Sequence, residues 1–308
     1  MVTTLDDDRR QLAVAEQQLF AASGVEYRSQ RLALADAPVG HVRVIETGEG
    51  LPLVFVHGAG MSAALWAPLL VHLPGYRCLA IDLPGCGLTD PFDHRGVELR
   101  SHARSFLRAV LDVLGLDSVM VVANSLGATY ALYLAAAEPT RISRLALVGV
   151  PGVALPGSRG SLAMRLYSRP KLGRLLSTMS PPLTPRIARQ LLVGIVGRPA
   201  VEALAQEMFE VAAATLRISE PTTRTLMPEL FSGRAPDPQH ALSDGELAAV
   251  AARTRFVWGS QDRFQGPEDG KRAVALMPHA DLVEVQGGHH PWWDDAEGCA
   301  ALIEEAIY

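Results

Sequence analysis

The apolar positions of the chain fall into two patterns that alternate along most of its length. Short continuous apolar runs, such as LVFVHG at 53–58 and VMVVAN at 119–124, stop at glycine or at a polar residue, as is typical of strands buried on both faces. Longer segments between the runs, such as 97–114, carry apolar residues at helical spacing. Strands that alternate with helices of about 10–15 residues predict βαβ units and a mostly parallel twisted sheet flanked by helices. The pattern therefore predicts an α/β fold.

Further apolar runs are expected to form strands, and the stretches between them to form helices. A polar-edged hairpin comes early, with HVRVIETG as its second strand. Strands are expected at 77–85, 144–151, 254–260 and 281–288, and helices at 62–73, 126–139, 268–276 and 296–307. In such a sheet, functional groups gather beyond the carboxyl ends of the strands. The residues that follow each apolar run are therefore the candidates for chemistry.

The alternation of strands and helices stops after Pro151 and resumes at 254. Between about 153 and 246 there are helical stretches separated by Pro and Gly, but no run typical of a buried strand. At the start of the chain, apolar residues at helical spacing end at Gly24, which predicts an added N-terminal helix. The predicted organisation is an N-terminal helical extension (1–27), a first part of the α/β core (28–152), a helical cap (153–246) and a second part of the core (247–308).

Composition and charge exclude several classes of protein. Of the 308 residues, 48% are hydrophobic, which is ample for a large core. The formal net charge of −5 leaves no broad basic surface for nucleic acid, and the arginines of 159–174, interleaved with apolar residues, predict a solvated helix face. No segment reaches the roughly 18 apolar residues of a membrane span. Residues 1–20 lack the basic and apolar regions of a signal peptide.

The cysteines indicate neither a disulfide framework nor a metal site. Cys78, Cys86 and Cys299 are odd in number, far apart and without metal-ligand spacing. Cysteines without a disulfide or metal pattern are typical of proteins in a reducing compartment. We therefore expect a cytoplasmic protein that acts on a small-molecule substrate, with no metal, no organic cofactor, no nucleic acid partner and no membrane span. Monomer and homodimer are both open.

Ser125 lies where the strand expected at 119–124 gives way to a helix. A residue at such a junction occupies a sharp turn, with its side chain projecting and the helix N-terminus behind it. Strand and helix approach closely there, so small residues are needed two positions before and two after the serine. Gly127 meets this need, and Ala123 meets it with one extra methyl group. Ser125 is either a nucleophile or an ordinary helix N-cap.

A serine hydroxyl becomes a good nucleophile only when a neighbouring base removes its proton. The candidate base lies in GGHHPWW, directly after the last expected strand. There His289 follows two glycines that free the loop, whereas His290 precedes a proline. Only one of the two can be the base, and we favour His289.

A third side chain must orient the imidazole. Asp262 lies just past the carboxyl end of the strand at 254–260, which is the same edge of the sheet as Ser125. The alternative role of Asp262 is to cap the helix that follows. No acidic residue follows the strand at 144–151, so Asp262 has no rival at the other plausible position.

Backbone N–H groups and a few side chains complete the predicted site. HGAG (57–60) ends an early strand in a glycine-rich loop whose N–H groups can point at a carbonyl oxygen, and the N–H of Leu126 is the natural second donor. Asp82 and Gly85 are expected only to shape the loop after a strand. The candidate substrate contacts, most of which could equally be ordinary packing residues, are Trp66, Asn124, Met164, Met208 and His290.

These motifs together resemble the α/β-hydrolase fold superfamily, specifically its capped serine hydrolases. The matching stretches are LVFVHGAGMSAALW, AIDLPGCGLTD, VMVVANSLGA, FVWGSQD and GGHHPWWDDAE, and they span about 40–152 and 253–305. The resemblance implies a catalytic triad of Ser125, Asp262 and His289, with the N–H groups of Ala59 and Leu126 as an oxyanion hole. It also implies that the segment 153–246 roofs the active site.

Departures from the family pattern limit what the resemblance implies. Ala123 and Ala128 replace glycines of the usual G-x-S-x-G-G motif, and HGAGM lacks the Gly-Pro-Gly of the carbon–carbon-bond hydrolases, although the Asn before the serine is similar to theirs. A serine at 125 argues against the branches whose nucleophile is a carboxylate. The cap matches no particular subfamily.

Our sequence-based hypothesis is an esterase that cleaves small to medium, largely apolar esters through an acyl-enzyme on Ser125. A carbon–carbon bond hydrolase or lyase with the same triad is the first alternative. A non-catalytic protein that uses the same fold to bind a ligand is the second. The intact order Ser, Asp, His speaks against the silent protein, because a protein without activity has no chemical need for all three.

Overall fold

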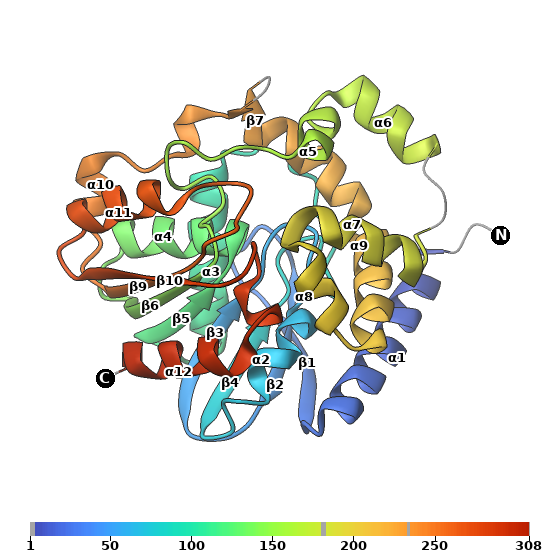
Figure 1. The fold of residues 1–308 in the computed structure, drawn as a ribbon, viewed down its shortest axis with the longest axis horizontal. Helices are drawn as coiled ribbons and strands as arrows, with labels where there is room; N and C mark the ends of the chain where they lie inside the picture. The colour runs from blue at the N-terminus through green and yellow to red at the C-terminus, as the bar shows by residue number, and fades with distance from the viewer. Residues whose placement is uncertain (1–3, 180–182, 233–234, 308) are drawn as a thin grey trace.

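A single twisted sheet organises the computed structural model, which describes residues 4–179, 183–232 and 235–307. Its eight strands lie in the order β1-β2-β4-β3-β5-β6-β9-β10 (Figure 1). The strands are β1 (Tyr27–Ala33), β2 (His41–Thr47), β3 (Leu51–Val56), β4 (Tyr76–Ile81), β5 (Val119–Ala123), β6 (Ile142–Val148), β9 (Arg253–Gly259) and β10 (Ala280–Val285). β2 pairs antiparallel with both β1 and β4, and every other pairing is parallel. The predicted α/β fold is confirmed.

The central strands are apolar without alternation because both faces of the sheet are covered. In β3, Val54 and Val56 belong to one buried cluster, whereas Leu53 and Phe55 belong to another on the opposite face. The first face is covered by α3 (Leu99–Val113), α4 (Ser125–Ala137), α10 (Asp244–Ala248) and α11 (Pro267–Leu276). The second is covered by η1 (Ala63–Trp66), α2 (Ala67–Leu70) and α12 (Ala296–Ile307).

A run of helices occupies the connection between β6 and β9. It consists of α5 (Leu162–Tyr167), α6 (Pro170–Met179), α7 (Pro185–Val196), α8 (Arg198–Ala203) and α9 (Gln206–Leu230), which lie along the top and right of the view in Figure 1. A short hairpin, β7 (Phe231–Ser232) with β8 (Ala235–Pro236), follows them. The sequence did not indicate this hairpin, because two-residue strands are too short to give a hydrophobic pattern. The role of the segment as a cap stays a prediction.

The N-terminal extension forms α1 (Leu5–Ser23), which ends at Gly24 in a left-handed conformation, with φ of 67°. A capping box of Thr4 and Asp7 begins this helix. Buried residues of α1 belong to the cluster on the second face of the sheet, and α1 lies against α9 (Figure 1). Asp8 of α1 accepts a hydrogen bond from Arg217 Nε of α9 over 2.7 Å. The helix is therefore attached to the insertion as well as to the core.

No helix in the described ranges is long and apolar enough to cross a membrane. Cys78, Cys86 and Cys299 are buried free thiols, one on each of three different elements or loops. Burial raises the pKa of each of these thiols to about 12, so they stay protonated and unreactive at neutral pH.

The close approach of α4 to the sheet leaves no space for a side chain at Gly127. A Cβ atom at this position would lie 2.4 Å from the carbonyl oxygen of Val56 and 2.6 Å from that of His57. Gly127→Ala is expected to lower the free energy of unfolding by about 1–3 kcal/mol or more, because backbone atoms must move. Thermal unfolding followed by circular dichroism measures the effect.

Gly194 in α7 provides the matched control, since no atom lies within 4 Å of the Cβ that Gly194→Ala would add. Removing a flexible glycine from a helix is expected to stabilise the protein by about 0.5–1 kcal/mol. Equal melting temperatures for the two variants would contradict the packing argument.

Candidate active site

Ser125 stands at a strained turn between β5 and α4. Its φ is 52°, and among the described residues Asp36 is the only other non-glycine residue with positive φ. Such a conformation costs on the order of 1–3 kcal/mol and is maintained only when the surroundings enforce it. Here Ser125 N donates to Val150 O over 3.1 Å, and Asn124 N donates to Val56 O over 3.0 Å. Ser125 is the first residue of α4 and Asn124 is its N-cap, so the N-cap alternative for Ser125 is wrong.

Glycines of neighbouring loops pack against the turn at Ser125, close to Ala123, which replaces a glycine of the family pattern. A Cβ at Gly58 would lie 2.9 Å from Ser125 Cβ, and a Cβ at Gly152 would lie 2.8 Å from the carbonyl carbon of Ser125. Ala123, by contrast, is a fully buried residue of β5 whose methyl group packs in the core on the first face of the sheet, and it has no positive φ. The extra methyl group of Ala123 therefore leaves the turn intact.

His289 and Asp262 form the contact expected of a base and its orienting acid. His289 Nδ1 lies 2.7 Å from Asp262 Oδ2, and the Asp262 side chain is fully buried. The carboxylate can only accept, so Nδ1 carries the proton and Nε2 has the free lone pair. Asp262 Oδ1 accepts from Phe264 N over 2.8 Å, which fixes the carboxylate within its own turn. The helix that follows begins at Pro267 with Gly266 as its N-cap, so Asp262 does not cap it.

Asn124 joins the two halves of the site. Its Nδ2 donates to Val148 O over 2.7 Å and to His289 O over 3.0 Å. The amide thus connects the turn of the serine to the end of β6 and to the loop of the histidine. Asn124 therefore holds the backbone of the site; it does not line the cavity that Ser125 and His289 line, and its contact with substrate stays a prediction.

His290 is buried among aromatic rings and does not line the cavity at Ser125. Its ring lies 4.8 Å from that of Trp292 and 4.5 Å from that of Trp293, measured between centroids. Burial holds the pKa of His290 well below its usual value, with the nearby His289 adding to the effect, so the ring stays neutral. His290 is therefore a packing residue of the C-terminal loop.

The loop at 57–63, which we call the oxyanion loop, has a fixed peptide orientation. Leu83 N donates to His57 Nε2 over 3.0 Å, so His57 carries its proton on Nδ1 and donates it to Gly58 O over 2.7 Å. Met61 N donates to the same carbonyl over 3.2 Å. In a trans peptide the C=O and the following N–H point in opposite directions. The Ala59 N–H is therefore directed away from these donors.

Ala59, Leu126, Ser125 and His289 line one cavity, which encloses about 450 Å³ of empty space including its opening. The N–H groups of Ala59 and Leu126 have no hydrogen-bond partner within the described parts of the chain. They are available to a negatively charged oxygen beside the serine. Ser125 and His289 line the same cavity but make no direct hydrogen bond with each other, a contact that in many enzymes forms only in the reacting complex.

Apolar side chains from the insertion and the core form most of the cavity wall. Met164 is the one predicted substrate contact that lies there. The sequence did not identify the other side chains of the wall as substrate contacts, because most of them have the spacing of ordinary packing residues and Arg159 was expected on a solvated helix face: Val150, Val153, Ser158, Arg159, Met227, Leu230, Phe231 and Phe264. Trp66 instead stacks on Trp292 at 4.2 Å, and Met208 is buried in the core on the second face. Neither lines this cavity, so their contact with substrate stays a prediction.

The predicted catalytic roles lead to a direct test. Ser125→Ala is expected to abolish covalent labelling by a fluorophosphonate probe, because no other residue supplies the attacking oxygen. Asp262→Asn is expected to lower kcat on the order of 10⁴-fold, because an amide does not hold the imidazole in the required tautomer. Gel fluorescence and steady-state kinetics measure the two effects.

Asp117→Asn is the control for Asp262→Asn, because Asp117 is an exposed acid far from the cavity wall. Its labelling and kcat are expected to equal those of the unaltered protein. Labelling that survived in Ser125→Ala would exclude Ser125 as the nucleophile.

Comparisons with known proteins show the family to which this chain belongs. The family model described as "alpha/beta hydrolase fold" matches residues 52–296. A 2-hydroxy-6-oxononadienedioate/2-hydroxy-6-oxononatrienedioate hydrolase from Burkholderia vietnamiensis is 30% identical over 281 residues, covering 85% of this chain and 89% of the relative. One from Pseudomonas putida is 29% identical over 273 residues, covering 84% and 88%.

Solved structures of low sequence identity share the fold. A carboxylesterase from Bacillus subtilis has a TM-score of 0.74 at 17% identity and covers 97% of this chain and 98% of its own. A 2-hydroxy-6-oxo-6-phenylhexa-2,4-dienoate hydrolase from a Rhodococcus strain has a TM-score of 0.71 at 22% identity and covers 92% and 99%. At such identities the likeness concerns the fold alone.

Proposed function

We propose, from the premise that this chain belongs to the alpha/beta hydrolase fold family, that it hydrolyses a carbon–carbon bond next to a ketone in a small anionic substrate. The observation that carries the proposal is the pair of relatives named as dienedioate hydrolases, which align with most of this chain. Their named substrates contain a hydroxyl, a ketone and two carboxylates but no ester or amide. A hydrolase acting on them must break a carbon–carbon bond. The alternative that ranked second on the sequence therefore becomes the leading proposal.

The arrangement of the candidate triad suits such a reaction. His289 Nε2 removes the proton of Ser125 while Asp262 holds Nδ1. The serine oxygen attacks the ketone carbon, and the N–H groups of Ala59 and Leu126 stabilise the resulting oxyanion. The bond to the neighbouring carbon then breaks, and its electron pair passes into the conjugated leaving group, which takes up a proton. Water, activated by His289, releases the acyl group as a carboxylic acid.

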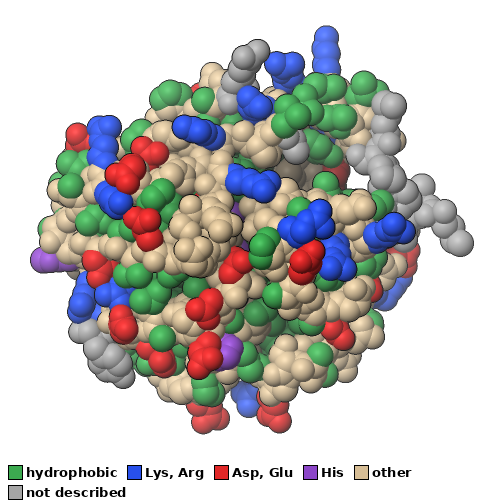
Figure 2. Space-filling view, viewed as in Figure 1, with side chains coloured by type: hydrophobic (Ala, Val, Ile, Leu, Met, Phe, Trp, Pro, Cys, Tyr) green, Lys and Arg blue, Asp and Glu red, His purple; other side chains and the backbone are tan. Residues whose placement is uncertain are grey.

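Charge at the mouth of the cavity supports an anionic substrate. Arg159 is an exposed residue that lines the cavity. Arg159 lies in the segment 153–201, which contains no Asp or Glu, although the whole chain carries a net charge of −5. The basic residues of this stretch are Arg159, Arg165, Arg169, Lys171, Arg174, Arg186, Arg189 and Arg198. In Figure 2, basic side chains gather over the upper right of the molecule, where α5–α8 lie in Figure 1.

An excess of positive charge near a cleft attracts anionic substrates and raises their rate of association. The sequence predicted that the arginines at 159–174 lie on a solvated helix face. Arg159 differs from them because it also borders the cavity. A carboxylate at this end of the substrate would leave the ketone to reach Ser125.

Ester hydrolysis is the second candidate, and the apolar cavity wall favours it. Apart from Arg159, Ser158, Ser125 and His289, the lining side chains are apolar, and HGAGM lacks the Gly-Pro-Gly of the carbon–carbon-bond hydrolases. The triad and the oxyanion donors would serve an ester equally well. Substrate choice therefore depends on whether the cavity requires a carboxylate.

A paired substrate panel tests the proposal. A 2-hydroxy-6-oxo-dienedioate is expected to have a kcat/KM at least 100-fold above that of any neutral p-nitrophenyl ester of matched size. Spectrophotometric loss of the dienedioate chromophore and release of p-nitrophenolate measure the two reactions. An ester turned over faster than every dienoate would reverse the order of the two candidates.

Arg159→Met tests the anion contact within the same panel. Loss of a charged hydrogen bond costs about 1.5–3 kcal/mol, so KM for the dienedioate is expected to rise roughly 10–150-fold. Turnover of the neutral ester is expected to stay within a factor of about two. Arg186→Met, which removes an exposed arginine of α7 that does not line the cavity, is the matched control. Equal effects of the two substitutions would show that Arg159 acts only through general charge.

A further inference from the structure

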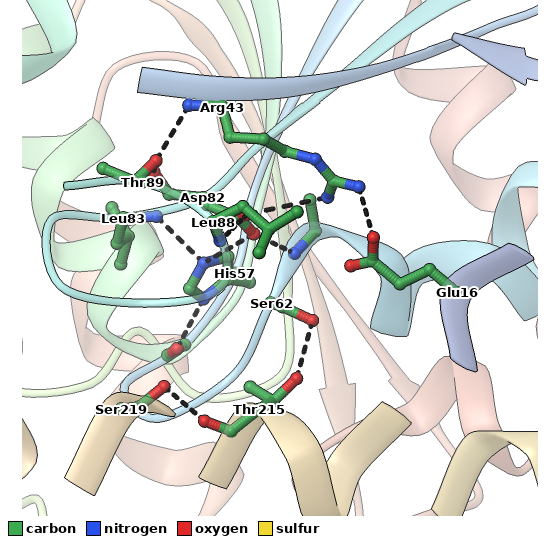
Figure 3. Close-up of polar contacts among 12 residues, drawn as sticks. Glu16, Arg43, His57, Ser62, Asp82, Leu83, Leu88, Thr89, Thr215 and Ser219 are labelled. Atoms are coloured by element: carbon green, nitrogen blue, oxygen red, sulfur yellow. Dashed lines mark hydrogen bonds and ion pairs between the residues drawn. The ribbon is translucent and has the colours of Figure 1, made fainter. Parts of the chain in front are cut away.

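A buried network of charged side chains lies beneath the oxyanion loop (Figure 3). It consists of Glu16 of α1, Arg43 of β2, Asp82 directly after β4, and His57 at the start of the loop. Their exposed fractions are 1%, 2%, 0% and 3%. The proposed chemistry uses none of the first three, and Glu16 and Arg43 lie outside residues 52–296 that the family model matches.

Arg43 and Asp82 connect the N-terminal helix to the oxyanion loop. Arg43 Nη2 donates to Glu16 Oε2 over 2.5 Å, and Arg43 Nη1 lies 3.6 Å from Asp82 Oδ2. Asp82 Oδ1 in turn accepts from Ala63 N, at the end of the oxyanion loop, over 2.7 Å. Figure 3 shows Arg43 extended between the two carboxylates.

Asp82 and His57 together restrain both ends of the loop. Asp82 holds the Ala63 end, and its Oδ2 also accepts from Leu88 N over 2.8 Å. His57 holds the other end, because it fixes the Gly58 carbonyl and thereby the direction of the Ala59 N–H. The two side chains are neighbours, with His57 Nε2 3.8 Å from Asp82 Oδ1. A shift of the Asp82 carboxylate would therefore disturb the whole loop.

A buried ionic network of this kind is expected to add little to the stability of the fold. Buried ion pairs often contribute no more to stability than apolar residues of the same size. Burial raises the pKa of Glu16 to about 7, against the opposing charge of Arg43, so keeping this carboxylate ionised is itself costly. The carboxylates of Glu16 and Asp82 share the single guanidinium of Arg43. A role in positioning accounts for that better than a role in stability.

We propose that Glu16 and Arg43 are positioning residues that hold the oxyanion loop in place through Asp82, so that α1 is part of the catalytic apparatus. The proposal rests on the proposed function, in which Ala59 N–H stabilises an oxyanion formed at Ser125. It assigns a catalytic purpose to an N-terminal helix that is otherwise a peripheral extension. Its effect appears in the transition state and not in substrate binding.

The test replaces the buried pair by apolar residues of similar length, with Glu16→Met and Arg43→Met combined. Because Asp82 stays buried without its guanidinium, the melting temperature is expected to fall, and the kinetics are measured at a temperature where the variant is fully folded. Because misplacing a catalytic group by about 1 Å can cost on the order of 100-fold, kcat is expected to fall roughly 10–100-fold while KM changes less than about twofold. The affinity for benzeneboronic acid, which forms a tetrahedral adduct with a reactive serine, is expected to fall by the same factor as kcat/KM.

The matched control removes the ion pair that joins α1 to α9, with Asp8→Asn and Arg217→Gln combined. That pair joins α1 to α9 over 2.7 Å and has no contact with Asp82. The control is expected to keep kcat and boronate affinity unchanged, even where it lowers the melting temperature. Equal kinetic losses in the two double variants would mean that docking of α1 alone matters, and this would overturn the proposal.

Two further outcomes are decisive. Unchanged kcat in a folded Glu16→Met/Arg43→Met variant would overturn the proposal. If that variant does not fold, Arg43→Lys decides, because it keeps the charge but offers a single donor group. A lower kcat at constant KM supports positioning, and an unchanged kcat overturns it. Failure of the proposed function would show separately, as a matched p-nitrophenyl ester that the unaltered protein turns over faster than every dienoate, and kcat for that ester would then be compared among the same variants.

Discussion

The turn at Ser125 is the constraint on which the rest of the site depends. A non-glycine residue with φ of 52° is held between a buried strand and a helix that begins at once, and the neighbouring loops approach within contact distance. Hydrogen bonds to Val56 and Val150 fix the backbone on either side. The strain of the turn is therefore balanced by the parallel sheet itself, because those two partners lie at the ends of β3 and β6, the strands that pair with β5.

A parallel sheet brings together residues that are far apart in the chain. Ser125, Asp262 and His289 each follow a strand, and the carboxyl ends of these strands lie at one edge. Asn124 adds a direct connection, because its amide bonds the backbone of the base loop as well as that of β6. The position of the imidazole thus depends on a residue next to the serine. The site behaves as one unit in which turn, base and acid share backbone contacts.

The parts of the chain outside the sheet shape the site in two different ways. The insertion between β6 and β9 supplies apolar side chains and Arg159 to the cavity wall. The N-terminal helix bears on the oxyanion loop from below, through a buried arginine between two carboxylates. We propose that the first addition bears on the choice of substrate and the second on the geometry of the reaction. Both are fixed to each other as well as to the core, since α1 and α9 pack together.

The sequence by itself determined the order of strands and helices and the identity of the residues that follow each strand. Continuous apolar runs such as 53–58 and 119–124 can be satisfied only by strands covered on both faces, which is why the fold and the positions of Ser125, Asp262 and His289 could be predicted. The same local logic also named Trp66, Asn124, Met208 and His290 as substrate contacts, but none of them lines the cavity at Ser125. An apolar or polar side chain near a motif can point either into a cavity or into the core. Only the tertiary structure decided that direction.

Long-range contacts also decided what no pattern could reveal. Glu16, Arg43 and Asp82 are separated by tens of residues and read individually as a helix acid, a strand arginine and a turn aspartate. They become one network only when α1, β2 and β4 are packed together, since the energy of a buried charge depends on its neighbours in space and not on those in sequence. Arg159 likewise became distinct from the other arginines of its segment only by its place at the cavity.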